Sequence, residues 1–158
     1  MISPAHDREI PRTQGVGTWR LAQDYLAAGK TLQPKWPKVS FVSYYLYGHG
    51  LELTLKAFLV SQGSTLRDLK RVGHDLKRAL RAAKKHASFA GIALTDTDTT
   101  IISWLNEYYR EKEFEYLVTG AKSLPTADEV QQLCERLQTD LKPLIWSAAK
   151  AHIANGAA

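Results

Sequence analysis

The chain has little of several residue types that mark particular classes of protein. Its 158 residues include one cysteine, Cys134, so no internal disulfide can form, and this usage is typical of a reducing cytoplasm. No run of 18 apolar residues is present, which argues against a transmembrane helix. The first 17 residues lack the apolar segment of a signal peptide. We therefore expect a cytoplasmic protein without a membrane partner.

Familiar catalytic and cofactor motifs are also missing. The sequence has no glycine-rich loop that would cradle phosphates, no serine nucleophile elbow and no zinc-ligand spacing. Glu111, Glu113 and Glu115 alternate, but they have no histidine partner and no glycine-containing loop, so we interpret them as a solvated surface. The sequence predicts neither a cofactor nor a bound metal.

The composition is that of a soluble globular domain, with 44% apolar and 23% charged residues. Residues 1–17 contain two prolines and two glycines without periodicity and predict a flexible N-terminal arm. The remaining residues, 18–158, are numerous enough to bury one core and predict a single domain.

The most regular stretch runs from Ser40 to Gln62 and predicts a buried helix of about six turns. Apolar residues recur at steps of three and four along two stripes, so we expect this helix to be covered on more than one side. Gly48 and Gly50 interrupt it, and glycines inside a helix favour close approach of a neighbour. The last helix carries a further apolar stripe. This stripe and the small surfaces at Gly48 and Gly50 together predict a homodimer with two-fold symmetry.

Helical periodicity continues through the rest of the chain. It predicts helices over Trp19–Gly29, Leu76–Ser88, the region of Ile101–Tyr109 and a long final stretch, with a short helical turn at Thr65–Lys70. Capping residues mark the starts of several of them, namely Asp75, the run Thr95–Asp98, and Thr126 with Glu129. Residues 110–124 have no clear period and predict a frayed helix end and a loop. The fold class is all-α, an up-and-down bundle of about five helices.

Positive charge is concentrated in one region. Residues 66–86 hold eight lysines or arginines against two aspartates, so the rest of the chain is close to neutral. Lys77, Arg81, Lys84 and Lys85 fall on the outer side of the predicted helix. Such a row can follow a nucleic-acid backbone, and the plainer alternative is a solvated helix face.

Several polar residues are candidates for a site. Glu52 and Lys56 follow His49 on one ridge of the central helix, where His49 could transfer protons or simply pack against Glu52. The other candidates are His74, Asp75 and Arg110. His74 precedes a helix start and could orient a phosphate or make a structural contact. Three aromatic residues of a later helix could stack on bases, but are more typical of a core: Trp104, Tyr108 and Tyr109.

The order of these signals resembles the HEPN family of small helical bundles. The resemblance rests on His49-Gly-Leu-Glu52-Leu-Thr-Leu-Lys56-Ala, on Gly73-His74-Asp75-Leu76, and on Leu105-Asn-Glu-Tyr-Tyr109. It implies a four-helix core with an added helix, homodimers, and roles in toxin–antitoxin pairs or beside nucleotidyltransferases. In active branches it implies metal-independent RNA cleavage.

The sequence departs from those branches in one respect. They carry an arginine followed four to six residues later by a histidine, whereas residues 111–127 contain no histidine. The same spacing occurs between Arg81 and His86, but these residues belong to another predicted helix. There the two side chains would lie about 140° apart around the helix axis. We therefore expect a module that binds RNA or a nucleotide through its basic helix without catalysis. The alternatives are a protein-interaction module with a partner such as a nucleotidyltransferase or antitoxin, and an RNase that uses His49 or His74.

Overall fold

The computed structural model describes residues 10–35, 37–116 and 120–156. Within these ranges the chain forms six α-helices and one short 3-10 helix, with no strand. The elements are α1 (Gln14–Leu32), α2 (Phe41–Ser61), α3 (Leu66–Val72), α4 (Leu76–Ala83), η2 (Ala87–Gly91), α5 (Asp96–Arg110) and α6 (Ala127–Ala154). The all-helical prediction is confirmed, while the α-helices number six rather than about five. None of the helices described is long and apolar enough to cross a membrane.

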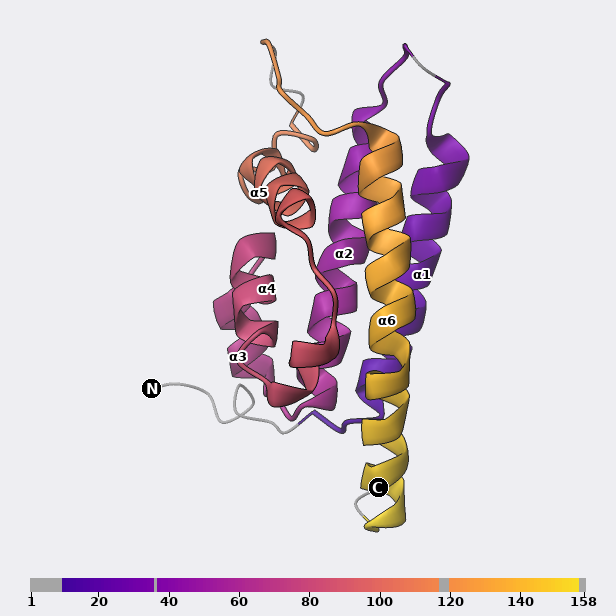
Figure 1. Ribbon diagram of the computed structural model, residues 1–158, viewed down its shortest axis with the longest axis vertical. Coiled ribbons are helices and arrows are strands. Elements are labelled where there is room, and N and C mark those ends of the chain that lie inside the picture. The colour runs from indigo at the N-terminus through magenta and orange to yellow at the C-terminus, as the bar shows by residue number, and fades with distance from the viewer. Residues whose placement is uncertain (1–9, 36, 117–119, 157–158) are drawn as a thin grey trace.

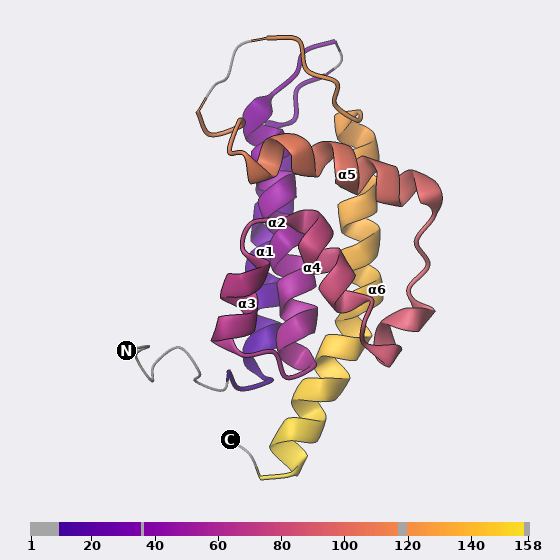
Figure 2. The same ribbon diagram turned by 90° about the vertical axis from the view of Figure 1, so that its left-hand side faces the viewer.

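Helix α2 forms the centre of the molecule and contacts α1, α4, α5 and α6 (Figures 1 and 2). Its start is fixed by Ser40, whose side chain accepts a hydrogen bond from the amide of Ser43. Fourteen of its 21 residues are buried, so it is covered on almost every side. The prediction that this helix is covered on more than one side is confirmed, and the buried residues in and around it include Tyr44, Leu51, Leu55, Leu59, Leu80, Leu105, Leu137 and Leu141.

The helices do not simply alternate up and down. Helices α1, α2 and α6 follow the long axis, and α2 and α6 both begin at the end drawn at the top of Figure 1. Helix α5 crosses this axis, as Figure 2 shows, and packs against α2, α4 and α6. The crossing brings α5 side chains onto the middle of α2.

Helix α1 is longer than predicted. It begins at Gln14 rather than Trp19 and continues through Gly29 to Leu32. A Cβ on Gly15 would lie 2.8 Å from the carbonyl oxygen of Ala57, so this glycine allows the first turn to press against α2. Residues 14–17 of the predicted arm are thus helical, and residues 1–9 lie outside the described residues.

Helix α4 is shorter than predicted and ends at Ala83 rather than Ser88. The chain then turns into η2, which buries Phe89 against Phe58 with ring centroids 5.3 Å apart. The prediction that Asp75 caps α4 is confirmed, since its carboxylate accepts from the amide of Arg78. The capping boxes Thr95–Asp98 and Thr126–Glu129 are also present.

The two glycines of α2 make contacts within the chain. A Cβ on Gly48 would lie 2.6 Å from the ring of Tyr109, and one on Gly50 would lie 2.5 Å from Leu26. Both glycines are buried, so they do not supply an open surface for a second copy. The predicted homodimer therefore has to rest on other surfaces.

The sole cysteine is buried in the core, whereas Trp104 is not. Cys134 is 1% exposed, with its Sγ 3.8 Å from the carbonyl oxygen of Tyr47, and burial raises the pKa of its thiol. Trp104 is 46% exposed, because the buried face of α5 passes through Ile101, Leu105 and Tyr109 instead. The prediction of a core tryptophan is wrong.

Candidate functional site

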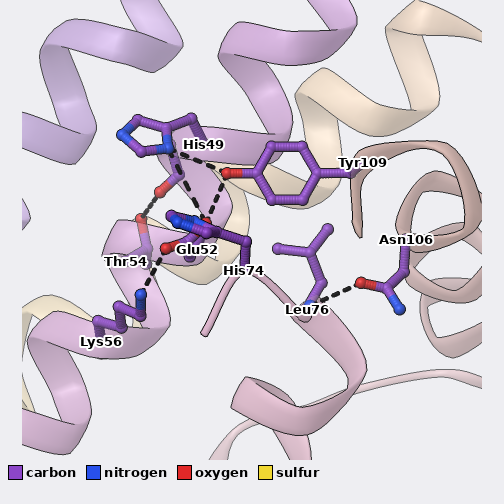
Figure 3. A network of polar contacts seen from close by, with 9 residues as sticks. His49, Glu52, Thr54, Lys56, His74, Leu76, Asn106 and Tyr109 are labelled. Carbon is purple, nitrogen blue, oxygen red and sulfur yellow. Dashed lines mark hydrogen bonds and ion pairs between the residues drawn. The ribbon is translucent and has the colours of Figure 1, made fainter. Parts of the chain in front are cut away.

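A buried carboxylate on α2 gathers polar side chains from three parts of the chain (Figure 3). The side chain of Glu52 is 1% exposed. Its Oε1 accepts from Lys56 Nζ at 2.5 Å, one turn further along α2. Its Oε2 accepts from the hydroxyl of Tyr109 on α5 at 2.5 Å and lies 3.1 Å from His74 Nδ1, just before α4. The Glu52 carboxylate therefore links α5 and the turn between α3 and α4 to the central helix α2.

His49 extends this cluster by one further hydrogen bond. Its Nδ1 is 2.9 Å from the hydroxyl of Tyr109 and 3.9 Å from Glu52 Oε2. The Tyr109 hydroxyl has one proton, which it donates to Glu52. The bond to His49 therefore uses the Nδ1 proton of the imidazole, and this tautomer leaves Nε2 with a free lone pair.

The surroundings of Glu52, His49 and Tyr109 determine the protonation state of each of these side chains. Burial is the largest influence on Glu52 and raises its pKa, but hydrogen bonds from Lys56, Tyr109 and His74 outweigh it and leave the pKa below its ordinary value. Burial also lowers the pKa of His49, although the charge of Glu52 opposes this. Burial and Glu52 together raise the pKa of Tyr109. At neutral pH the cluster thus holds an ionised carboxylate, a protonated phenol and a neutral imidazole.

The cluster opens onto a pocket of about 230 Å³. The walls are formed by Tyr45, His49, His74, Tyr109, Lys112 and Glu115. Lys112 has a left-handed backbone with φ of 59°, uncommon for a residue other than glycine, and it follows the end of α5. The ring of His49 stacks on Tyr45 with centroids 5.9 Å apart. A polar ligand entering here would meet two imidazoles, the Lys112 ammonium group and the Glu115 carboxylate.

Of the six residues predicted for a polar site, four meet. His49, Glu52, Lys56 and His74 form the cluster, and His49 contacts both Glu52 and a neighbouring helix, as its packing alternative anticipated. Asp75 instead caps α4 and accepts a 3.2 Å hydrogen bond from Asn106 Nδ2. Arg110 forms an exposed ion pair with Glu111 and lies outside the cluster.

Sequence reasoning missed the part that α5 plays. The sequence predicts Tyr109 only as a core or base-stacking aromatic, and Asn106 only as part of the motif that carries the resemblance. Asn106 is buried, and its Oδ1 accepts from the amide of Leu76 at 2.7 Å, which holds the first turn of α4. The signal was available, because Asn106 and Tyr109 are polar groups on the otherwise apolar face of a predicted helix.

The predicted basic row lies along α4 and the turn that follows it. Lys77, Arg81, Lys84 and Lys85 are all exposed, and none has an acidic partner within 4 Å among the residues described. The opposite face of α4 is buried through Leu76, Ala79, Leu80 and Ala83. We call these four cations the basic face.

The alternating glutamates serve different contacts. Glu111 pairs with Arg110, Glu113 pairs with Lys122, and Glu115 lines the pocket. In the part of the chain that the structure covers, no three histidine, cysteine, aspartate or glutamate side chains are grouped so as to hold a metal ion.

Comparisons with family models, with curated proteins and with solved structures gave no match to this chain.

Proposed function

We propose that the protein is a HEPN-like module that binds RNA through the basic face of α4. The observation that supports this is the row of four exposed cations without acidic partners, opposite a buried apolar stripe that fixes the helix. Phosphate contacts require only positive charge in register with the backbone, and unpaired cations are free to make them. A helix face that served solvation alone would carry acidic neighbours as readily as basic ones.

The salt dependence of binding tests this proposal. Four phosphate contacts to a single strand predict a slope of log affinity against log salt of about −3, at about −0.7 per contact. The variant Lys77→Glu/Arg81→Glu should lose RNA binding, and Arg20→Glu/Lys150→Glu is the matched control with the same change in net charge. Equal binding by the two variants would refute the basic face as the RNA site.

A second candidate function is metal-independent RNA cleavage in the pocket. It is favoured by one observation, that His49 and His74 both lie beside Glu52 and line the same pocket. Neutral His49 has a free Nε2 that can take the proton of a ribose 2′-hydroxyl, whose oxygen then attacks the adjacent phosphorus. When His74 carries a proton, it can give that proton to the departing 5′-oxygen as the P–O5′ bond breaks, which leaves a 2′,3′-cyclic phosphate.

Labelled RNA incubated with a chelator distinguishes cleavage from binding alone. Cleavage by this route should survive the chelator, be lost in His49→Ala and in His74→Ala, and persist in the control His152→Ala. Intact RNA at a concentration where binding is complete would exclude the second candidate and leave the first unaffected.

One observation supports the alternative that the protein is an interaction module, which forms a homodimer or binds another protein. Leu32, Val39 and Val42 are each more than half exposed and lie where α1 ends and α2 begins. Apolar surface of this kind fits a homodimer or a partner such as an antitoxin or nucleotidyltransferase. Light scattering at micromolar concentration should return about twice 17.7 kDa for the homodimer, and the monomer mass would refute it.

A further inference from the structure

One wall of the pocket beside Glu52 carries two opposite charges on the same turn of backbone. Lys112 and Glu115 both line the pocket, and both belong to the turn that follows α5. The carbonyl oxygen of Lys112 accepts from the amide of Glu115 at 3.0 Å, which holds the two residues together. Phe114 lies between them in sequence, is buried, and stacks on Tyr44 with ring centroids 5.8 Å apart. The turn is therefore anchored to α2.

These two charges are paired neither with each other nor with another side chain. In the part of the chain that the structure describes, neither Lys112 nor Glu115 has an ion-pair partner within 4 Å. Burial is the largest influence on the pKa of three side chains that line the pocket, and the Glu115 charge acts to raise all three: Tyr45, His49 and Tyr109. An acceptor and a donor held side by side suit a ligand that has both kinds of group.

The pocket also has aromatic walls. Tyr45 is half-buried, and its ring lies nearly parallel to that of His49, with an angle of 9° between the two planes. Tyr109 is buried beside them, with its ring centroid 6.3 Å from that of Tyr45 (Figure 3 shows His49 and Tyr109). Unpaired nucleic-acid bases stack on such rings and present their Watson–Crick edge to side chains. The volume of about 230 Å³ is below the roughly 300–1,000 Å³ of sites for drug-sized ligands, so it suits one base rather than a base pair.

We propose that this pocket binds a single unpaired guanine base. Guanine presents two adjacent donors, N1–H and the N2 amino group, beside the acceptor O6. The two carboxylate oxygens of Glu115 can accept from both donors, and the Lys112 ammonium group can donate to O6. Adenine and cytosine have a ring-nitrogen acceptor next to their amino group, and uracil has one donor between two acceptors. Each of these bases would leave a carboxylate oxygen facing an acceptor.

His74 connects the pocket with the basic face. Its side chain lines the pocket and is 59% exposed, and Lys77 follows three residues later, within about 11 Å of chain. A single strand whose phosphates contact the basic face can therefore place one base in the pocket. This base preference rests on the proposed RNA binding, which supplies the strand, and it adds that the favoured RNA has an unpaired guanine.

NMR titration of the full chain with the four ribonucleoside 5′-monophosphates tests the pocket apart from the strand. GMP should bind saturably, shift the amide signals of the turn that carries Lys112 and Glu115, and bind about tenfold more tightly than AMP, CMP or UMP. Inosine monophosphate lacks the N2 amino group and should bind more weakly than GMP. Glu115→Gln replaces one acceptor with a donor and should weaken GMP about tenfold. The control Glu107→Gln makes the same change of charge at an exposed residue of α5 and should bind as the unaltered chain does.

Two variants separate this site from the basic face. Lys77→Glu/Arg81→Glu should lose RNA and keep its affinity for GMP. Glu115→Gln should keep the salt slope of RNA binding but lose the preference for a uridine oligomer with one guanosine over one without. The guanine site is overturned by absence of saturable GMP binding, by equal affinity for the four nucleotides, by unchanged affinity in Glu115→Gln, or by loss of GMP in the basic-face variant. Saturable GMP binding by a chain that binds no RNA would support the pocket and refute the basic face alone.

Discussion

The hydroxyl of Tyr109 donates a 2.5 Å hydrogen bond to Oε2 of Glu52, across 57 positions of sequence. Both side chains are buried, so this bond forms away from competing water. It joins the last turn of α5 to the middle of α2, and through Oε1 of the same carboxylate to Lys56. The geometry of the pocket depends on this carboxylate staying ionised and in place.

Loss of the Tyr109 hydroxyl should destabilise the protein measurably. Hydrogen bonds to charged groups contribute about 1.5–3 kcal/mol, so Tyr109→Phe should lower the free energy of unfolding in urea by about that amount. Tyr25→Phe is the control, because Tyr25 also packs against the His49 ring but no hydrogen bond of its hydroxyl is found among the described residues. Equal effects of the two substitutions would contradict an ionised Glu52 as the acceptor.

Stability should fall in two stages as the pH is lowered. His49 has a folded-state pKa below its ordinary 6.5, so the unfolded chain gains this proton first, and the free energy of unfolding declines below about pH 6.5. Glu52 has a folded-state pKa below 4.5, so its contribution is present above that value and is lost as the pH falls through the folded-state pKa. Urea titrations across this range should show the first stage vanish in His49→Gln and persist in His152→Gln.

Alanine at two helical glycines should have opposite effects. In Gly48→Ala the new methyl group would meet the Tyr109 ring at 2.6 Å, and overpacking of this kind costs about 1–3 kcal/mol. In Gly17→Ala nothing lies within 4 Å of the new Cβ, so the higher helix propensity of alanine should add about 0.5–1 kcal/mol to α1. Thermal melts compare the two directly, and a stabilised Gly48→Ala would refute the close packing of α5 on α2.

The central helix should depend strongly on Leu55, which is 0% exposed. Truncating a buried leucine to alanine costs about 2–5 kcal/mol, so Leu55→Ala should lower the melting temperature clearly. Leu21→Ala on the 48%-exposed side chain of α1 should change stability little. An unchanged melting temperature for Leu55→Ala would contradict the assignment of α2 as the core helix.

Local signals predicted most of the fold. The extent of α2 follows from apolar residues at helical spacing between Ser40 and Gly63, and Thr126 with Glu129 marks the start of α6, because both patterns act within a few residues. The end of α4 at Ala83 was missed because it depends on Phe89 reaching Phe58, a contact that no local pattern contains.

The candidate site was predictable only on one helix. Steps of three and four residues place three polar side chains on one ridge of the central helix, so the sequence alone predicts that they lie together: His49, Glu52 and Lys56. That Tyr109 rather than Arg110 completes the cluster depends on the angle at which α5 crosses α2. The side-chain pattern of α5 shows which face is buried but does not show which neighbour that face meets.

The enclosure of Cys134 has a practical consequence for spectroscopy. This sole cysteine of the chain is 1% exposed and burial raises the pKa of its thiol, so the folded protein presents no reactive sulfur to a maleimide dye. A cysteine introduced at Lys85 can therefore be labelled alone, without first removing the natural one. Fluorescence from this position would then report on occupancy of the basic face.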